Sequence, residues 1–291
     1  MKEISLNSLK RKPTQFLLLA IATALIVIHL AIVWKSKDLS LFFNSVLFLM
    51  AISSIIWEKR FNLNLHSEIF SSFFGISLIL LISLRVAFIP PSLDNIWFSC
   101  FPFISALGLA LLASGVKGLK QYKNELLALF FLAAPRIFML LLAPIFDISI
   151  FTAKFVNLIL WYTGSDVIRS GLTISFPKLG KGIEVYSACS GIEQIIQILG
   201  ISILFISMFP IKKQQKIIAP IVAITLAFIV NAMRVALMAI FVASGDQKLF
   251  SYWHDGEGSQ LFPVVSVLLF GCFCWFFFLR NEQEKQDYTQ I

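Results

Sequence analysis

The sequence predicts an all-α polytopic membrane protein with about eight transmembrane helices and a short extracytoplasmic, hairpin-like loop before Cys189. Of the 291 residues, 58% are hydrophobic and 14% are charged, whereas a soluble domain is about 45–50% apolar. Several apolar stretches exceed the roughly 18 residues that cross about 30 Å of hydrocarbon. Length and composition together therefore favour a multi-pass membrane protein.

The apolar stretches follow one another along the chain, separated by short polar connections. The first is too long for the core of a signal peptide and no small-residue cleavage site follows it, so we expect a retained helix. The expected spans are 16–34, 39–57, 69–89, 95–113, 126–146, 190–209, 217–243 and 261–279. They predict an N-terminal bundle of five spans (1–146), a loop (147–188), a region of three spans (189–279) and a tail (280–291).

The long loop has two parts. Residues 151–162 are apolar and aromatic, which is typical of an interfacial helix or a short re-entrant segment. Residues 166–176 and 183–186 then alternate between apolar and polar, with Pro177 and Gly180 between them. This pattern predicts a small hairpin that brings Cys189 to the membrane surface.

Lysine and arginine are unevenly distributed between the connections. Fourteen lie in the N-terminal tail, the C-terminal tail and the even-numbered connections, and seven lie on the opposite side. The positive-inside rule then predicts cytoplasmic termini in a plasma membrane and an extracytoplasmic loop 147–188. The clustering of basic residues in alternate connections accounts for the role of the net charge of +8 without an anionic partner. Because no basic patch with stacking aromatics lies outside the spans, we expect no nucleic-acid partner.

Three unusual side chains fall on the same predicted side. Cys189 lies at the outer end of the sixth span, Arg234 in the outer half of the seventh, and His254 just before the eighth. A thiol, a guanidinium and an imidazole at one face of a membrane suggest a cysteine enzyme.

The other three cysteines do not suggest a further site. Cys272 and Cys274 are two residues apart on a helix and so point to different faces, and with Cys100 they are expected to be small apolar fillers. The four cysteines form no disulfide framework. We expect neither a metal nor a cofactor.

Cys189 stands where a helix is expected to begin. Ser190 and Glu193 match a capping box, which would make Ser190 the N-cap. A thiol at a helix entry is favoured as the thiolate, and the N–H groups near Ser190 and Gly191 could bind an oxyanion. The alternative is a structural cysteine in a tight turn.

Arg234 lies within an apolar segment, where an arginine costs about 2.5–3.5 kcal/mol at the bilayer centre. Asn231, three residues earlier, shares its helix face. Arg234 could stabilise a thiolate or a developing oxyanion, with Asn231 orienting the arginine or a substrate carbonyl. The alternative is a structural ion pair or snorkelling to the surface.

His254 could take a proton from the thiol and return it to a leaving amine. Asp255 and Glu257 are candidates to orient the imidazole. The alternative is an ordinary loop histidine beside the interfacial aromatic residues Tyr252 and Trp253.

These residues carry a resemblance to a known family. The segments Ala188-Cys189-Ser190-Gly191-Ile192, Asn231-x-x-Arg234 and His254-x-x-x-Gly258 resemble the exosortase/archaeosortase family over about 150–280. The histidine is more similar to the bacterial exosortases, and Ile-Glu-Gln after Cys-Ser-Gly is similar to cyanobacterial members.

The resemblance implies a membrane cysteine transpeptidase or protease. Its substrates would be membrane-anchored proteins that end in a short motif such as Pro-Glu-Pro, a transmembrane helix and a basic tail. Cys189 would attack the scissile carbonyl, Arg234 would stabilise the oxyanion and His254 would protonate the leaving amine. Water or an unidentified envelope acceptor would then resolve the thioacyl enzyme.

Two other functions fit the residues. One is an envelope enzyme that transfers an acyl or glycan group, with Cys189 carrying the acyl group. The other is a transporter or scaffold with Arg234 and Arg136 as pathway residues. The chain has no H-E-x-x-H, G-x-S-x-G or G-x-x-x-x-G-K-[ST] motif, which weakens metalloprotease, serine-hydrolase and nucleotide-driven alternatives.

Overall fold

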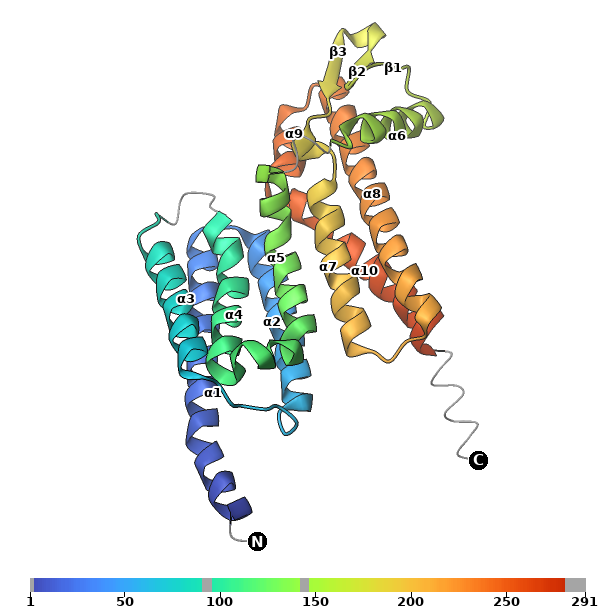
Figure 1. Cartoon of the computed structure of the whole chain (residues 1–291). Coiled ribbons are helices and arrows are strands. Elements are labelled where there is room, and N and C mark those ends of the chain that lie inside the picture. Colours follow the sequence, from blue (N-terminus) through green and yellow to red (C-terminus); the bar gives the residue numbers. More distant parts are fainter. Residues whose placement is uncertain (1–2, 91–95, 142–146, 281–291) are drawn as a thin grey trace, which may run out of the picture. The chain divides into compact units, whose positions relative to one another are not determined.

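Long apolar helices make up most of the computed structural model, which is 81% helical (Figure 1). The structure describes residues 3–90, 96–141 and 147–280. The chain divides into two units, Met1–Ala133 and Ala134–Ile291, and the division falls inside one helix, α5. The predicted all-α polytopic membrane fold is confirmed.

Unit 1 consists of apolar helices joined by short connections. They are α1 (Glu3–Lys35), α2 (Leu39–Lys59), α3 (Ile69–Ala87), α4 (Ile96–Gly118) and α5 (Lys123–Leu141), which continues into unit 2. A buried polar pair sits among them: His29 Nε2 lies 2.8 Å from Ser45 Oγ, and the imidazole stacks on Phe101. His29, which lies inside an expected span, is therefore used in packing this unit.

Close approach of α3 and α4 depends on two glycines. A Cβ built on Gly75 would lie 2.5 Å from the Gly108 carbonyl oxygen, and one built on Gly108 would lie 2.7 Å from that of Gly75. Small residues allow two membrane helices to pack backbone against backbone.

Seven segments of the described chain are long and apolar enough to cross a membrane. The fourth, Ile96–Met139, contains α4 and most of α5, which the sequence predicts as two separate spans. Gly115 interrupts this run with a φ of +65°. Residues 142–146 at the end of the expected span 126–146 lie outside the described residues, as do residue 95 and tail residues 281–291.

Unit 2 contains three long helices that pack side by side. They are α7 (Ile192–Met208), α8 (Lys213–Ser244) and α10 (Leu261–Cys274), the last extended by the π-helical turn η5 (Trp275–Leu279). At one end of this bundle lie α6 (Ser149–Tyr162), a small sheet, and α9 (Gln247–His254), as Figure 1 shows.

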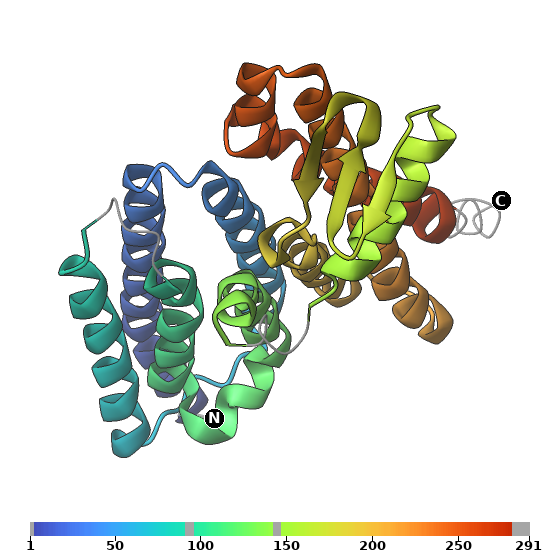
Figure 2. The ribbon, with the colours of Figure 1, turned by 90° about the horizontal axis from the view of Figure 1, so that it is seen from above.

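The apolar segment expected at the interface forms α6. Its 14 residues span only about 21 Å at 1.5 Å per residue, which is too short to cross a bilayer. The helix lies across the end of α8 and packs against it (Figures 1 and 2).

The predicted hairpin is a three-stranded antiparallel sheet in the order β1-β2-β3. Its strands are β1 (Ile168–Ser170), β2 (Thr173–Phe176) and β3 (Lys181–Glu184). The additional strand arises because Gly171, at a φ of +61°, reverses the chain inside the alternating stretch 166–176. One predicted arm is thus itself a hairpin.

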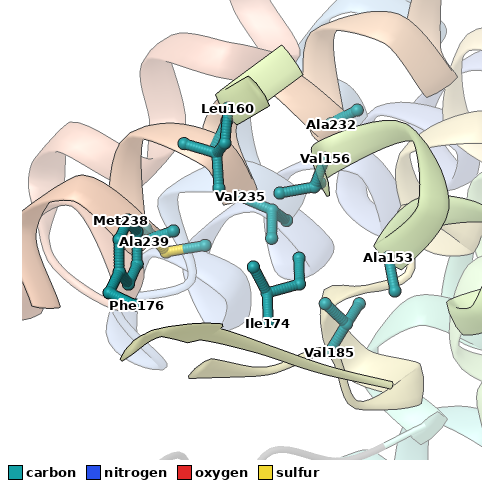
Figure 3. Close-up of a cluster of buried hydrophobic side chains, with 11 residues drawn as sticks. Ala153, Val156, Leu160, Ile174, Phe176, Val185, Ala232, Val235, Met238 and Ala239 are labelled. Atoms are coloured by element: carbon teal, nitrogen blue, oxygen red, sulfur yellow. The ribbon is translucent and has the colours of Figure 1, made fainter. Parts of the chain in front are cut away.

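One face of this sheet packs on α6 and α8 (Figure 3). The buried side chains are Ala153, Val156 and Leu160 from α6, Ile174, Phe176 and Val185 from the sheet region, and Ala232, Val235, Ala236, Met238 and Ala239 from α8. This apolar cluster fixes the sheet on the helical bundle directly before the chain reaches Cys189.

Candidate active site

Cys189 closes a short 3₁₀ turn, η3 (Ser187–Cys189), ahead of α7. The Cys189 N–H donates to the Tyr186 carbonyl at 2.9 Å, and the Ser190 N–H donates to the Ser187 carbonyl at 3.1 Å. The Ser190 hydroxyl also donates to the Ser187 carbonyl, at 2.6 Å. These bonds fix the position of the thiol relative to the start of the helix.

Two neighbouring helices hold this turn. From α8, the buried Asn231 amide donates to the Cys189 carbonyl at 3.0 Å. From α6, the buried Thr152 hydroxyl donates to the Ser190 carbonyl at 2.7 Å. Asn231 was expected to orient Arg234 or a substrate carbonyl, and its contact in the structure is instead with the backbone of the cysteine.

The predicted capping box is wrong. The N-cap of α7 is Gly191, and no side chain caps the helix. Ser190 is in the right-handed helical region, at φ −65° and ψ −22°, whereas a capping serine needs an extended backbone. Its hydroxyl accepts only a long bond of 3.4 Å from the Ile192 N–H. Glu193 lies in the first turn of α7.

His254 is the last residue of α9. This short helix begins where the Asp246 carboxylate accepts a hydrogen bond from the Leu249 N–H at 3.0 Å. Within the helix the imidazole stacks on Phe250, with ring centroids 5.1 Å apart and planes 15° apart. The stacking restricts the direction in which the imidazole points.

The imidazole connects the thiol to a carboxylate. Cys189 Sγ and His254 Nε2 are 3.7 Å apart, within hydrogen-bonding distance for sulfur. On the other side of the ring, Nδ1 lies 2.7 Å from Asp255 Oδ2. The Asp255 side chain is 84% exposed, whereas that of His254 is 30% exposed. The carboxylate can therefore hold the ring with Nε2 directed at sulfur while remaining hydrated.

Arg234, on α8, reaches the same group of residues. Its Nη2 donates to the His254 main-chain carbonyl at 2.7 Å. Its charge also lies close enough to Cys189, Asp255 and Glu193 to interact with them electrostatically. The arginine thus places a positive charge beside the sulfur and ties the end of α9 to α8.

Main-chain donors near the thiol are limited. The Ser190 N–H, expected to face an oxyanion, is already bonded to the Ser187 carbonyl. Among the described residues no hydrogen bond uses the Gly191 N–H, and the Arg234 Nε is buried without a partner. These two groups, one on the main chain and one on a side chain, could therefore donate to a negative charge that develops near Cys189.

The helices around the site are also cross-linked. The Gln194 amide of α7 donates to the Ser266 hydroxyl of α10 at 2.6 Å. A Cβ on Gly258 would lie 2.6 Å from Tyr252 Cε1, so the chain after His254 packs tightly on α9. Within the part of the chain that the structure describes, no group of three His, Cys, Asp or Glu side chains is placed to hold a metal ion.

Together, the helices and these side chains define a multi-pass membrane protein whose thiol, imidazole, carboxylate and guanidinium meet at one end of a helical bundle. The sequence profile of the transmembrane exosortases matches residues 33–271. The chain therefore belongs to the transmembrane exosortase family, as the resemblance in the sequence predicted. No curated protein and no solved structure matches the chain.

The structure brings Cys189, Arg234 and His254 together, and their roles remain predictions. Sequence reasoning missed Thr152, because a threonine on an apolar helix carries no signal until its neighbours are known. Asp255 was one of two candidates to orient the imidazole, and the sequence did not decide whether this adjacent residue faces the ring. It faces the ring because the helix ends at His254.

Proposed function

We propose that this exosortase-family protein is a membrane-embedded cysteine transpeptidase or protease. Its substrates are membrane-anchored proteins with a C-terminal sorting signal of a short motif, a transmembrane helix and a basic tail. It cuts them at the extracytoplasmic face. The observation that carries the proposal is the Cys189 Sγ–His254 Nε2 distance of 3.7 Å, with the ring held by Asp255 at 2.7 Å.

The first step is attack on the scissile carbonyl. His254 Nε2 accepts the thiol proton, and Cys189 sulfur forms a bond to the carbonyl carbon while the carbonyl oxygen takes the electron pair. Arg234 and the Gly191 N–H stabilise this oxyanion. Donors of this kind act most strongly where the negative charge develops.

The second step breaks the peptide bond. The oxyanion collapses, the C–N bond cleaves, and the imidazolium of His254 gives its proton to the leaving nitrogen. The released amine carries the transmembrane helix, and the cargo remains as a thioester on Cys189. A nucleophile then displaces the thiolate: water gives hydrolysis, and an envelope amine or hydroxyl gives transfer.

The test is processing of a reporter protein fused to Pro-Glu-Pro, an apolar helix and a basic tail, followed by gel mobility. We expect Cys189→Ala to abolish processing, and Cys272→Ala to retain it as the control. His254→Ala should slow processing by about 10²–10⁴-fold, the usual contribution of a positioned acid or base. Normal processing by Cys189→Ala would reject the nucleophile.

Acyl or glycan transfer is separated from peptide cleavage in the same membranes. If Cys189 carries a lipid acyl group, a labelled acyl donor will leave a hydroxylamine-sensitive label on the chain without any reporter present. A labelled Cys189 together with an uncut reporter would favour the acyl-transfer alternative over the proposal.

A further inference from the structure

Strand β3 has a free edge. It is the outermost strand of the sheet, and among the described residues it pairs only with β2. The Val185 N–H donates to the Leu172 carbonyl at 3.1 Å, so Val185 belongs to a hydrogen-bonded pair. Because bonded and non-bonded positions alternate in an antiparallel pair, the main-chain groups of Gly182 and Glu184 point away from β2.

These main-chain groups have no partner. Within the described ranges 3–90, 96–141 and 147–280, no hydrogen bond outside the sheet uses the N–H or the carbonyl of Gly182 or Glu184. Both residues are exposed. The edge therefore presents two N–H donors and two carbonyl acceptors in the spacing that an added strand requires.

The side chains beside this edge are held by other groups. The Lys181 ammonium donates to the Ala243 carbonyl at 3.2 Å. The Glu184 carboxylate hydrogen-bonds the Tyr186 phenol, and this bond is the main reason that the phenol pKa is raised. Neither charge thus blocks an incoming backbone, although charged residues are a common protection for sheet edges.

The exposed face next to the edge is hollowed. A groove of about 590 Å³ lies on it, lined by residues that include Thr173, Ser175, Glu184 and Tyr186. Alternate side chains of an added strand would project over this face, since successive side chains of a strand point to opposite sides.

The edge leads directly to the nucleophile. Cys189 lies five positions after Glu184, so their Cα atoms are at most about 18 Å apart at full extension. A peptide paired with Gly182 and Glu184 would reach the thiol within about five further residues. This distance would allow a short recognition motif to bind the β3 edge while the adjacent scissile bond lies at the thiol.

We propose that the free edge of β3 binds the sorting motif of the substrate as an added extended strand, parallel to β3. The inference rests on the proposed function and states how that site holds its substrate. A parallel direction follows because the cargo must precede the scissile carbonyl and the transmembrane helix must follow it, just as β3 precedes Cys189 and α7 follows it. Main-chain hydrogen bonds would supply affinity and the groove would supply side-chain selection.

The first test removes one edge donor. Glu184→Pro deletes an N–H that β2 does not use, whereas Glu184→Ala removes the side chain and keeps the N–H. We expect kcat/KM for the reporter to be at least about 10-fold lower for Glu184→Pro than for Glu184→Ala, mostly through KM, because both variants lack the side chain and only the proline lacks the N–H. Equal kcat/KM values for the two variants would overturn the proposal.

A second measurement remains decisive if the proline variant fails to fold. This measurement uses a chain that carries Glu184→Cys and in which Cys189 and the other native cysteines are replaced by alanine. The chain is oxidised with a series of reporters, each of which carries a single cysteine at a different position of the motif. We expect disulfides at every second position. Uniform cross-linking, or none, would overturn the added strand.

The outcomes distinguish a failure of the proposed function from a failure of the proposed strand at the β3 edge. A wild-type chain that leaves the reporter uncut rejects the proposed function. A wild-type chain that cuts the reporter, with Glu184→Pro equally active, rejects only the strand at the β3 edge. Labelling of Cys189 by a small thiol reagent in the Glu184→Pro and Glu184→Ala variants checks that the site remains accessible and folded.

Discussion

Gly191 is the residue on which the geometry of the thiol turn depends most directly. Its φ of +89° lies in the left-handed region, and its α-carbon faces the amide of Asn231. That amide in turn holds the carbonyl of Cys189. A side chain at Gly191 would therefore strain the backbone and displace the group that positions the nucleophile.

We expect Gly191→Ala to reduce reporter processing at least 10-fold. The left-handed backbone alone costs about 1–2 kcal/mol for a residue with a Cβ, and this Cβ would also lie 2.5 Å from Asn231 Nδ2. Gly164→Ala is the matched control, because Gly164 has a φ of +84° and a Cβ built on it would meet no described atom within 4 Å. An equal reduction of processing in both variants would show that backbone strain, and not the contact with Asn231, decides the outcome, and normal processing by Gly191→Ala would contradict the prediction.

Arg234 combines a fixed hydrogen bond with a positive charge near sulfur. Its bond to the His254 carbonyl requires a donor at a defined distance from α8, and its charge lies within electrostatic range of Cys189, Asp255 and Glu193. A lysine would retain the charge but not the planar arrangement of donors.

We expect Arg234→Lys to be nearly as damaging as Arg234→Ala. Loss of a charge-assisted hydrogen bond costs about 1.5–3 kcal/mol, or about 10- to 150-fold in rate. The measurement is the processing rate at matched membrane levels of each variant. Near wild-type processing by the lysine variant would mean that charge alone suffices at this position.

At the scale of elements, α6 both covers one face of the sheet and helps to position the turn that carries Cys189. It packs its apolar face on α8 and the sheet, and it also donates the Thr152 hydroxyl to the Ser190 carbonyl. The site therefore draws on α6, α8 and α9 as well as on the turn that carries Cys189. Displacement of α6 should therefore change the position of the Cys189 thiol even though Cys189 itself is not substituted.

Thr152→Val should lower processing by about 10-fold. The substitution keeps the shape but leaves the Ser190 carbonyl without this donor, at a cost of about 1–3 kcal/mol for a buried unsatisfied group. Thr163→Val is the control, because the Thr163 hydroxyl bonds only carbonyls of its own helix, those of Ile159 and Leu160. Equal thermal stability with unequal processing would place the effect at the site.

At the scale of the whole molecule, the charge asymmetry predicts an extracytoplasmic sheet and active site. Lys178 is a suitable reporter of this orientation, since its side chain is 81% exposed and lies in the turn between β2 and β3. It belongs to the loop that the positive-inside rule assigns to the outer side.

In a background without the native cysteines, we expect Lys178→Cys to react with a membrane-impermeant maleimide on intact cells. A cysteine at Lys120, in a connection predicted to be cytoplasmic, should react only after permeabilisation. The reverse pattern would invert the topology and place the active site on the cytoplasmic side.

The sequence by itself determined the membrane class, the family and the residues that the site unites. Hydrophobic length is a local property, so the apolar runs predicted the helices whatever their neighbours were. Cys189, Arg234 and His254 stood out because each is unusual beside or within an apolar segment. The resemblance that they carry agrees with the family match over residues 33–271.

Only the tertiary structure decided how these residues are positioned. The capping box failed because the helical backbone of Ser190 left no extended residue to cap α7. The third strand, the bond from Thr152 and the placement of Asp255 against the imidazole likewise arise from contacts between segments far apart in sequence or from one local turn. Such contacts depend on which surfaces of the folded chain meet. The periodicity of a single segment cannot predict which other segment it will contact.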